Sequence, residues 1–124
     1  MTGHSLISVI DDDESLRTAL VSLIRSLDLQ ARSFDSAEDF LKAGEWRSFA
    51  CIISDIQMPG MSGIDLKRHL VAQDVQTPVI MITAHAEPNL KERALASGAF
   101  GFLKKPFDAN VLFECLERAL KLSS

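Results

Sequence analysis

The chain has 124 residues, of which 47% are hydrophobic and 24% are charged, and its 13 basic and 17 acidic residues give a formal net charge of −4. The length fits one domain with one core, and no apolar run approaches the roughly 18 residues that a membrane span requires. Subtracting Asp11, Asp12, Asp13 and Asp55 from the 17 acids leaves 13 of each sign, so the composition offers no basic surface for DNA.

The first residues and the two cysteines give no sign of a secreted, disulfide-bonded protein. Residues 1–5 contain neither a basic leader nor an apolar signal sequence, so we expect a cytoplasmic location without membrane association. Cys51 lies in an apolar run, and Cys115 lies on the apolar face of a predicted helix. We therefore expect both to be small buried residues rather than a disulfide or metal pair.

Short β-branched runs alternate with segments of helical period, a pattern typical of a parallel sheet with helices on both faces. The predicted strands are residues 6–10, 30–34, 51–54, 78–82 and 99–103. The first and last predicted helices have the clearest apolar stripes, which run from Leu16 to Leu27 and from Val111 to Leu120.

Capping and breaking residues predict where the other helices begin and end. Ser36 and Gly44 bound the second helix, Ser62 or Gly63 opens the third, Pro88 lies in the first turn of the fourth, Gly98 ends it, and Asp108 caps the last.

Polar side chains stand where the predicted strands end. Asp11, Asp12 and Asp13 follow the first strand, Asp55 the third, Thr83 the fourth and Lys105 the fifth. Because open parallel sheets bind ligands beyond the carboxyl ends of their strands, we expect these groups to share one crevice. Clustered carboxylates repel one another unless a cation lies among them, and oxygen ligands favour Mg²⁺ over zinc. A lysine and a hydroxyl beside such a metal predict a site for a transferring phosphoryl group.

Four segments, residues 9–14, 54–63, 83–84 and 102–107, together resemble the receiver domain of bacterial two-component response regulators. The resemblance covers nearly the whole chain and implies one receiver domain over residues 1–124. It implies an α/β, doubly wound (βα)5 flavodoxin-like fold, with a five-stranded parallel sheet in the order 2-1-3-4-5 and helices on both faces.

The resemblance also implies the chemistry. Asp55 would be the phosphoacceptor, receiving the phosphoryl group from a phosphohistidine of a sensor histidine kinase. Mg²⁺, or Mn²⁺, would be bound directly by Asp12 and through water by Asp11, with Asp55 and the backbone carbonyl of Gln57 completing the protein ligands. Asp13 has no such role, and we expect it to begin the first helix, where the helix dipole favours an acid.

The remaining implied roles concern switching. Lys105 precedes Pro106 and would pair with the phosphoryl group through a turn that is cis in many relatives, whereas strand alternation points Lys104 into solvent. Thr83 would donate a hydrogen bond to the phosphoryl group, and Phe102 would turn inward when Thr83 moves. Gln57 and His85 could tune the lifetime of the phosphate.

Residues 36–41 and 82–86 look most like those of FixJ-type transcriptional regulators, in which a DNA-binding domain follows the receiver and phosphorylation promotes dimerisation. We therefore expect a phosphoacceptor switch without enzymatic turnover, which is the N-terminal part of a longer regulator that reaches DNA only through a domain absent here. Three alternatives remain: a stand-alone receiver that signals through a protein partner, a scaffold that accepts no phosphate, and a Mg²⁺-dependent aspartyl phosphohydrolase. Such hydrolases usually carry an acid where this chain has Gln57, which disfavours the last.

Overall fold

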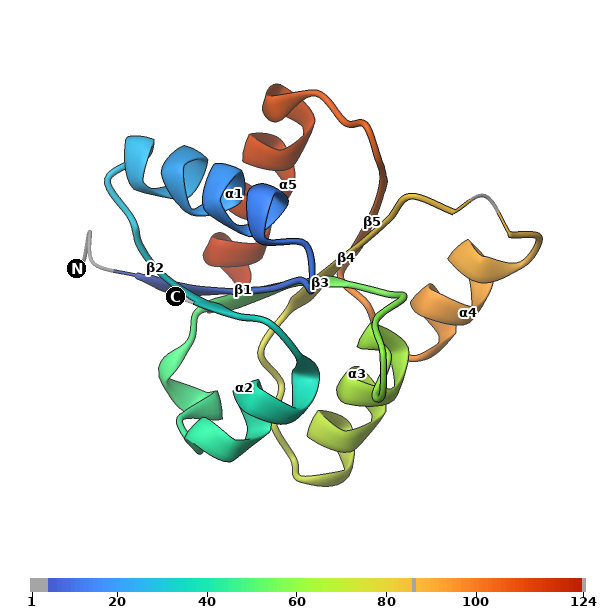
Figure 1. Ribbon diagram of the computed structural model, residues 1–124. Helices are drawn as coiled ribbons and strands as arrows, with labels where there is room; N and C mark the ends of the chain where they lie inside the picture. The colour runs from blue at the N-terminus through green and yellow to red at the C-terminus, as the bar shows by residue number, and fades with distance from the viewer. Residues whose placement is uncertain (1–4, 86, 124) are drawn as a thin grey trace.

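The computed structural model describes residues 5–85 and 87–123, in which strands and helices alternate along the chain (Figure 1). In chain order the elements are β1 (Leu6–Ile10), α1 (Glu14–Ser26), β2 (Gln30–Phe34), α2 (Ala37–Ala43), the 3₁₀ turn η1 (Trp46–Ser48), β3 (Cys51–Asp55), α3 (Gly63–Ala72), β4 (Val79–Thr83), α4 (Leu90–Ala96), β5 (Gly101–Lys104) and α5 (Ala109–Ser123). Within the described ranges, no helix combines the length and the apolar character needed to cross a membrane.

The strands form one five-stranded parallel sheet in the order β2-β1-β3-β4-β5. β1 pairs with β2 through Ile10 and Phe34, and with β3 through Ile10 and Ser54. β2 therefore lies on one side of β1, and β3, β4 and β5 follow on the other side, so the strand order reverses at β1. The doubly wound fold and its strand order confirm the expectation from the sequence, and the crevice of such a sheet lies beyond the carboxyl ends of β1 and β3.

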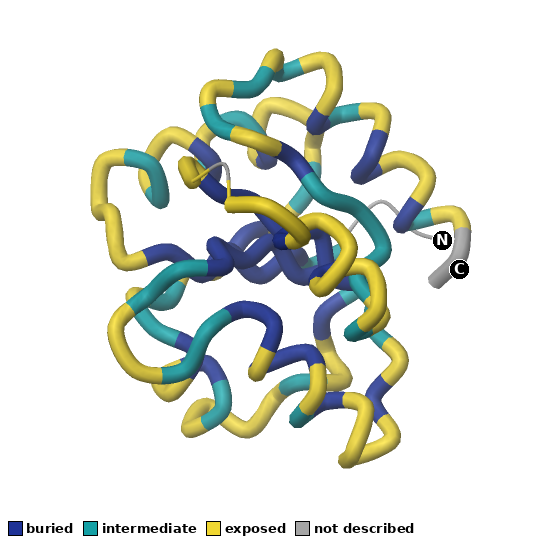
Figure 2. Tube along the Cα trace, turned by 90° about the vertical axis from the view of Figure 1, so that its right-hand side faces the viewer, coloured by how far each residue is buried: buried dark blue, intermediate teal, exposed yellow. Residues whose placement is uncertain are grey.

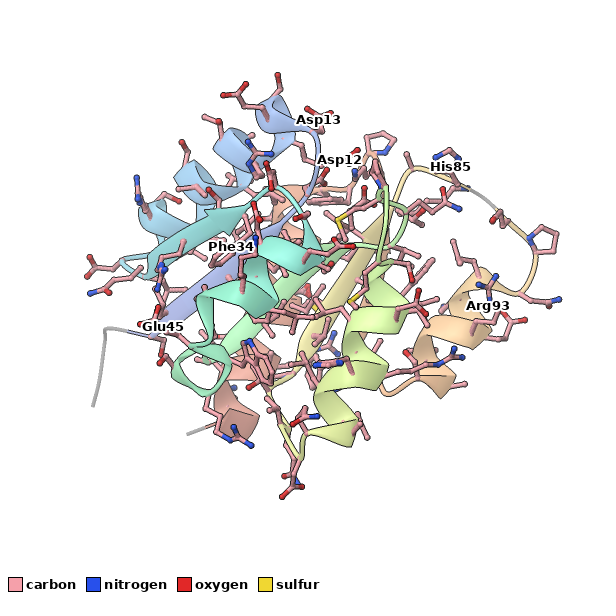
Figure 3. All side chains as sticks on the ribbon, turned by 60° about the horizontal axis from the view of Figure 1, so that its bottom comes forward. Asp12, Asp13, Phe34, Glu45, His85 and Arg93 are labelled. Atoms are coloured by element: carbon pink, nitrogen blue, oxygen red, sulfur yellow. The ribbon has the colours of Figure 1, made fainter. Side chains whose placement is uncertain are left out.

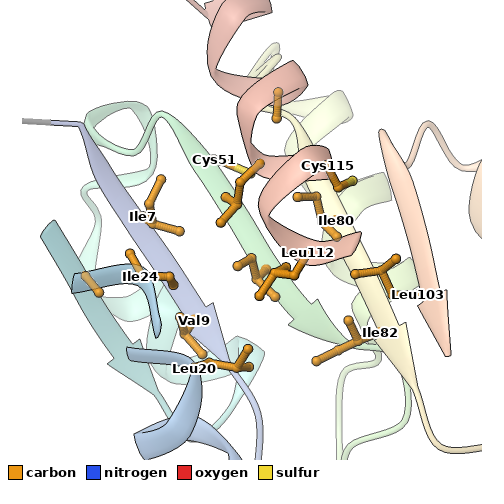
Figure 4. Packing of buried hydrophobic residues seen from close by; sticks show 14 residues of the cluster. Ile7, Val9, Leu20, Ile24, Cys51, Ile80, Ile82, Leu103, Leu112 and Cys115 are labelled. Atoms are coloured by element: carbon orange, nitrogen blue, oxygen red, sulfur yellow. The ribbon is translucent and has the colours of Figure 1, made fainter. Parts of the chain in front are cut away.

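Apolar side chains alternate between the two faces of the sheet, so that the sheet has a core on each side. One core packs beneath α1 and α5 and includes Ile7, Val9, Leu20, Ile24 and Leu112 (Figure 4). The other lies on the face covered by α2, α3 and α4 (Figure 1). Burial colouring shows a buried central band, which β1, β3 and β4 supply, surrounded by exposed turns (Figure 2).

Both cysteines lie within the first of these cores, as predicted. Cys51 and Cys115 are free thiols, and both are buried (Figure 4). Burial raises the pKa of each thiol above its usual value. A thiol that stays protonated in an apolar core is a poor nucleophile and a poor metal ligand, so the two cysteines serve packing.

Most predicted helix ends are confirmed by the caps. Side-chain oxygens of Asp13, Ser36 and Ser62 accept hydrogen bonds from backbone N–H groups in the first turns of α1, α2 and α3. Asp108 does the same for the N–H of Asn110 at the start of α5. Gly98, with φ of 104°, follows the last residue of α4 and its cap.

Several predicted boundaries were wrong by one or two residues. Pro88 is not in the first turn of α4, because Asn89 has a φ of 67° and the helix begins only at Leu90. β4 begins after Pro78 and includes Thr83, and β3 extends to Asp55. β5 begins at Gly101 rather than at residue 99, since the N–H of Ala99 still donates to the carbonyl of Ala94 in α4.

One buried hydroxyl group in the described structure is expected to lower the stability of the fold. Ser8 Oγ in the middle of β1 is buried and has no hydrogen-bond partner among the described residues. An unsatisfied buried polar group costs about 1–3 kcal/mol. Ser8→Ala is therefore expected to raise the free energy of unfolding by about 1 kcal/mol, measured by urea denaturation, whereas Ser33→Ala at an exposed position of β2 should change it by less than about 0.5 kcal/mol. A destabilised Ser8→Ala protein would contradict this assignment.

Candidate functional site

The carboxyl ends of β1, β3, β4 and β5 bring together the residues that the sequence singled out. Asp11 and Asp12 follow β1, Asp55 is the last residue of β3, Thr83 is the last residue of β4, and Lys105 follows β5. In Figure 3, Asp12, Asp13 and His85 lie along this edge of the molecule, whereas Glu45 lies toward its far end. Residues that are up to 94 positions apart in sequence are therefore brought together at this edge of the sheet.

Three carboxylates form the centre of the site. One oxygen each of Asp11, Asp12 and Asp55 lies within 4.8 Å of the others. Asp11 is fully buried and Asp55 is 6% exposed, whereas Asp12 is open to solvent. The cluster thus has two buried acids at its base and one exposed acid at its mouth.

Asp11 is held from several sides. Its Oδ1 accepts a hydrogen bond from the N–H of Asp13 at 2.9 Å, and its Oδ2 lies 3.2 Å from Lys105 Nζ. The Arg17 guanidinium donates to the Asp11 carbonyl at 2.8 Å. Each carboxylate oxygen of Asp11 therefore has one protein partner, and these contacts fix the orientation of the group.

Lys105 reaches both buried acids. Its Nζ is 3.2 Å from Asp11 Oδ2 and 3.7 Å from Asp55 Oδ2, and its side chain is only 20% exposed. The Lys105–Pro106 peptide bond is cis, as the resemblance suggested. Lys104 is exposed, so the two adjacent lysines have the opposite orientations that strand alternation predicted.

The surroundings of Asp55 disfavour the ionised form of its carboxyl group. Burial, followed by the negative charge of Asp11, raises the pKa of Asp55 from 3.8 to about 6, although Lys105 and a backbone hydrogen bond from Gln57 oppose the shift. A single ammonium therefore does not neutralise the three carboxylates.

The donor set suits a hard divalent cation. It consists of carboxylate oxygens without histidine or cysteine, which is the preference of Mg²⁺ and Mn²⁺ and not that of zinc. The exposed position of Asp12 leaves one side open, as Mg²⁺ needs when it keeps several water ligands. The residues present thus fit the predicted metal.

Thr83 and Phe102 occupy adjoining strands. Thr83 is fully buried, its Oγ1 accepts a hydrogen bond from the N–H of His85 at 3.1 Å, and its carbonyl accepts one from the N–H of Lys105 at 2.7 Å. Phe102 on β5 is partly buried and packs against the core beneath α2, α3 and α4. Thr83 is thus joined directly to the segment that carries Lys105, whereas Phe102 lies outside the acid cluster.

The two predicted tuning residues are placed differently. His85 is exposed, and its backbone contacts Thr83. The side-chain amide of Gln57 donates to both carboxylate oxygens of Glu87, at 3.0 and 3.1 Å. Neither Glu87 nor Arg17 was predicted from the sequence. Glu87 reaches Gln57 from another loop, Arg17 reaches the Asp11 carbonyl from α1, and no motif marks either contact.

A close backbone approach fixes the loop behind Asp55. A Cβ at Gly63 would lie 2.6 Å from the carbonyl oxygen of Asp55, and the Gly63 N–H donates to the Ile56 carbonyl at 2.9 Å. Only glycine allows α3 to begin this close to the end of β3. The loop that follows Asp55 is consequently held firmly against its own helix.

Comparison with known proteins gives a consistent result. The family model described as "Response regulator receiver domain" matches residues 7–117. The transcriptional regulatory protein FixJ of Bradyrhizobium diazoefficiens is 38% identical over 98% of this chain and 59% of its own length. The response regulator protein TmoT of Ectopseudomonas mendocina is 38% identical over 97% of this chain and 54% of its own length.

The structure of the response regulator StyR superposes with a TM-score of 0.89 at 38% identity, covering 96% of this chain and 60% of that one. The present chain therefore spans between half and three fifths of the length of these relatives.

Proposed function

Because this chain belongs to the family of response regulator receiver domains, in which an aspartate is phosphorylated, we propose that Asp55 is its phosphoacceptor. The observation that carries the proposal is the placement of the Asp55 carboxylate among Asp11, Asp12 and Lys105 at the carboxyl edge of the sheet. The donor would be a phosphohistidine of a sensor histidine kinase. A carboxylate oxygen of Asp55 attacks phosphorus, the new O–P bond forms as the N–P bond of the phosphohistidine breaks, and the imidazole nitrogen leaves with the bonding electrons.

The neighbouring residues prepare Asp55 for this attack. Asp12 and the backbone carbonyl of Gln57 would bind Mg²⁺ directly together with Asp55, and Asp11 would do so through water. Bound there, the metal would offset the repulsion between the carboxylate and the phosphoryl oxygens. Lys105 already faces Asp55, so its ammonium can pair with a phosphoryl oxygen as negative charge accumulates.

The output would follow from the two strands beside the acceptor. The Thr83 hydroxyl, whose oxygen accepts a hydrogen bond from the His85 N–H, would move toward the phosphoryl group and donate its own hydrogen to a phosphoryl oxygen, and Phe102 would move into the vacated space. Phosphorylation adds about −1.5 to −2 charges at one point, enough to bias an element that has two arrangements. We propose that the surface of α4, β5 and α5 changes as a result.

The likeness to the transcriptional regulatory protein FixJ supports an output in transcription. Residues 1–124 would then be the receiver part of a longer cytoplasmic regulator that contacts DNA through a separate domain, with homodimerisation through the changed surface as the signal. His85 and Gln57 adjoin the phosphoryl position and would tune how long the phosphate lasts.

Labelling with acetyl phosphate and Mg²⁺ tests the proposal. Intact-mass spectrometry is expected to show the gain of one phosphoryl group in the wild-type protein, no gain in Asp55→Asn, and no gain when EDTA removes the metal. Asp13→Asn is the matched control. Asn caps a helix as well as Asp does, so this variant should stay folded and be labelled like wild type. Labelling of Asp55→Asn would place the acceptor elsewhere, and an unlabelled wild-type protein would favour a scaffold.

A further inference from the structure

The hydrogen bonds between Gln57 and Glu87 join two loops at the mouth of the site. Gln57 lies in the β3–α3 loop, two residues after Asp55, and Glu87 lies in the β4–α4 loop, four residues after Thr83. The Gln57 amide nitrogen is 3.0 and 3.1 Å from the two carboxylate oxygens of Glu87. One side chain from the acceptor's loop is thus bonded to one from the loop that is expected to switch.

The Gln57 side of this pair is firmly anchored. The Ile56 N–H donates to the Ile82 carbonyl at 2.9 Å, and the Gly63 N–H donates to the Ile56 carbonyl at 2.9 Å. Farther along the loop, the Met61 N–H donates to Glu38 Oε2 of α2 at 2.8 Å. The loop that carries Gln57 is therefore fixed to β4, to α3 and to α2.

The Glu87 side is weakly anchored. In residues 84–85 and 87–89, the Gln57–Glu87 pair is the one hydrogen-bonded link that the structure describes to any element outside β4 and α4. The helix that follows, α4, has seven residues, and no side chain caps its start at Asn89. A short helix without a side-chain cap contributes little stability of its own.

Residues 84–85 and 87–89 are all exposed, so the loop gains little from packing before Leu90, which is buried at the start of α4. Glu87 is exposed, and Gln57, Glu87 and Arg93 line a groove of about 440 Å³ between the β3–α3 loop and α4. Figure 3 shows Arg93 on α4, on the same side of the molecule as His85. The two loops are therefore separated by open space at this point, and the paired side chains span it.

We propose that Gln57 and Glu87 form a clasp that holds the β4–α4 loop in its unphosphorylated position and opens when Asp55 is phosphorylated. The opening rests on the proposed function. A phosphoryl group on Asp55 adds negative charge two residues before Gln57, whose amide holds the negatively charged Glu87 carboxylate. Like charges repel, so the added charge favours the release of Glu87. The phosphoryl oxygens also compete with Glu87 as acceptors for the Gln57 amide. Gln57 and Glu87 are thus positioning residues that oppose the switch.

Amide hydrogen exchange followed by NMR tests the closed clasp in the unphosphorylated protein. The informative amides are those of His85, Leu90 and Arg93, which donate hydrogen bonds within or beside this loop. Gln57→Ala and Glu87→Ala are each expected to accelerate their exchange about three- to tenfold, the effect of losing one typical hydrogen bond at an exposed position. The double variant should exchange no faster than the faster single variant, because both substitutions break the same link.

Two further variants separate a clasp from a general loosening of the loop. Glu87→Gln keeps an acceptor oxygen for the Gln57 amide and should retain most of the protection. Glu114→Ala removes an exposed carboxylate from another helix, α5, and should leave the exchange of these amides as in wild type. Unchanged exchange in both single variants, or a double variant whose acceleration equals the product of the two, overturns the clasp.

The opening is tested by repeating the measurement with Mg²⁺ and beryllium fluoride, which mimics a phosphoryl group on a carboxylate. Wild type and Glu87→Ala are then expected to exchange at equal rates in the loop, and a difference that persists overturns the opening. A wild-type protein that binds no beryllium fluoride and takes no phosphate overturns the proposed function and the opening with it. The exchange of the unphosphorylated variants still decides whether the closed clasp exists.

Discussion

Replacing Lys105 with alanine is expected to slow the phosphorylation of Asp55 by acetyl phosphate about 100-fold, the usual effect of removing one preorganised donor from developing negative charge. The Lys105 ammonium lies 3.7 Å from Asp55 Oδ2 and is largely shielded from water. A charge that the fold holds in place stabilises a transition state more than a mobile charge does, because it need not reorganise during the reaction. Time courses of intact mass at fixed Mg²⁺ and acetyl phosphate measure the rate.

Lys104→Ala is the matched control for this experiment. Lys104 is the neighbouring residue of the same chemical type, and it is exposed to solvent. Its removal should change the rate less than about twofold, because exposed charges are screened by water and salt. Equal losses in the two variants would show that only the total charge matters, and a Lys105→Ala protein with the wild-type rate would remove Lys105 from the mechanism. Circular dichroism of each variant confirms that it is folded.

The sequence predicted the sheet and the acid cluster well because both depend on short-range patterns. β3 and β4 are buried along their whole length and are apolar up to their last one or two residues, as is typical of strands that are covered on both faces. Once such strands are parallel, their ends must meet, so the positions of Asp11, Asp55 and Lys105 could be inferred without knowing any contact. Lys105 and Asp11 are 94 residues apart, and they are nevertheless 3.2 Å from each other.

Other features could not be predicted from local patterns. The start of α4 depends on Asn89 having a positive φ, a conformation that asparagine tolerates but does not require. Arg17 contacts the Asp11 carbonyl, and Glu87 contacts Gln57. Both contacts depend on the conformations that long side chains adopt across the site. Long side chains of this kind have many rotamers of similar free energy, so sequence patterns do not specify their partners.

The second large effect concerns stability, because the site gathers buried acids at a cost to the fold. Asp55→Asn is expected to raise the free energy of unfolding in EDTA at pH 8 by about 1–3 kcal/mol. The pKa of Asp55 is raised from 3.8 to about 6 in the folded protein, mainly by burial and then by Asp11. Each pKa unit corresponds to about 1.4 kcal/mol, so the ionised carboxylate costs the folded state at most about 3 kcal/mol. The variant also loses one ion pair of Lys105, which reduces the gain.

The sign of the pH dependence identifies the cause of this effect. Between pH 3.8 and about 6 the folded protein holds the Asp55 proton more tightly than the unfolded chain does. The unfolding free energy contributed by Asp55 therefore falls as pH rises through this window and is constant above it. Asp55→Asn has no such proton. The difference in unfolding free energy between this variant and wild type should therefore be near zero below pH 4 and reach its full value above about pH 7. Urea denaturation at a series of pH values measures the difference.

Asp74→Asn serves as the control for the stability experiment, because Asp74 is exposed and its φ of 60° suits asparagine equally well. Its unfolding free energy should stay within about 0.5 kcal/mol of wild type at every pH. Adding Mg²⁺ should stabilise wild type more than Asp55→Asn and so narrow their difference, since a ligand that binds only the folded state stabilises it by mass action. An advantage of Asp55→Asn that does not depend on pH would contradict an electrostatic origin. An advantage that Mg²⁺ leaves unchanged would show that Asp55 contributes nothing to metal binding.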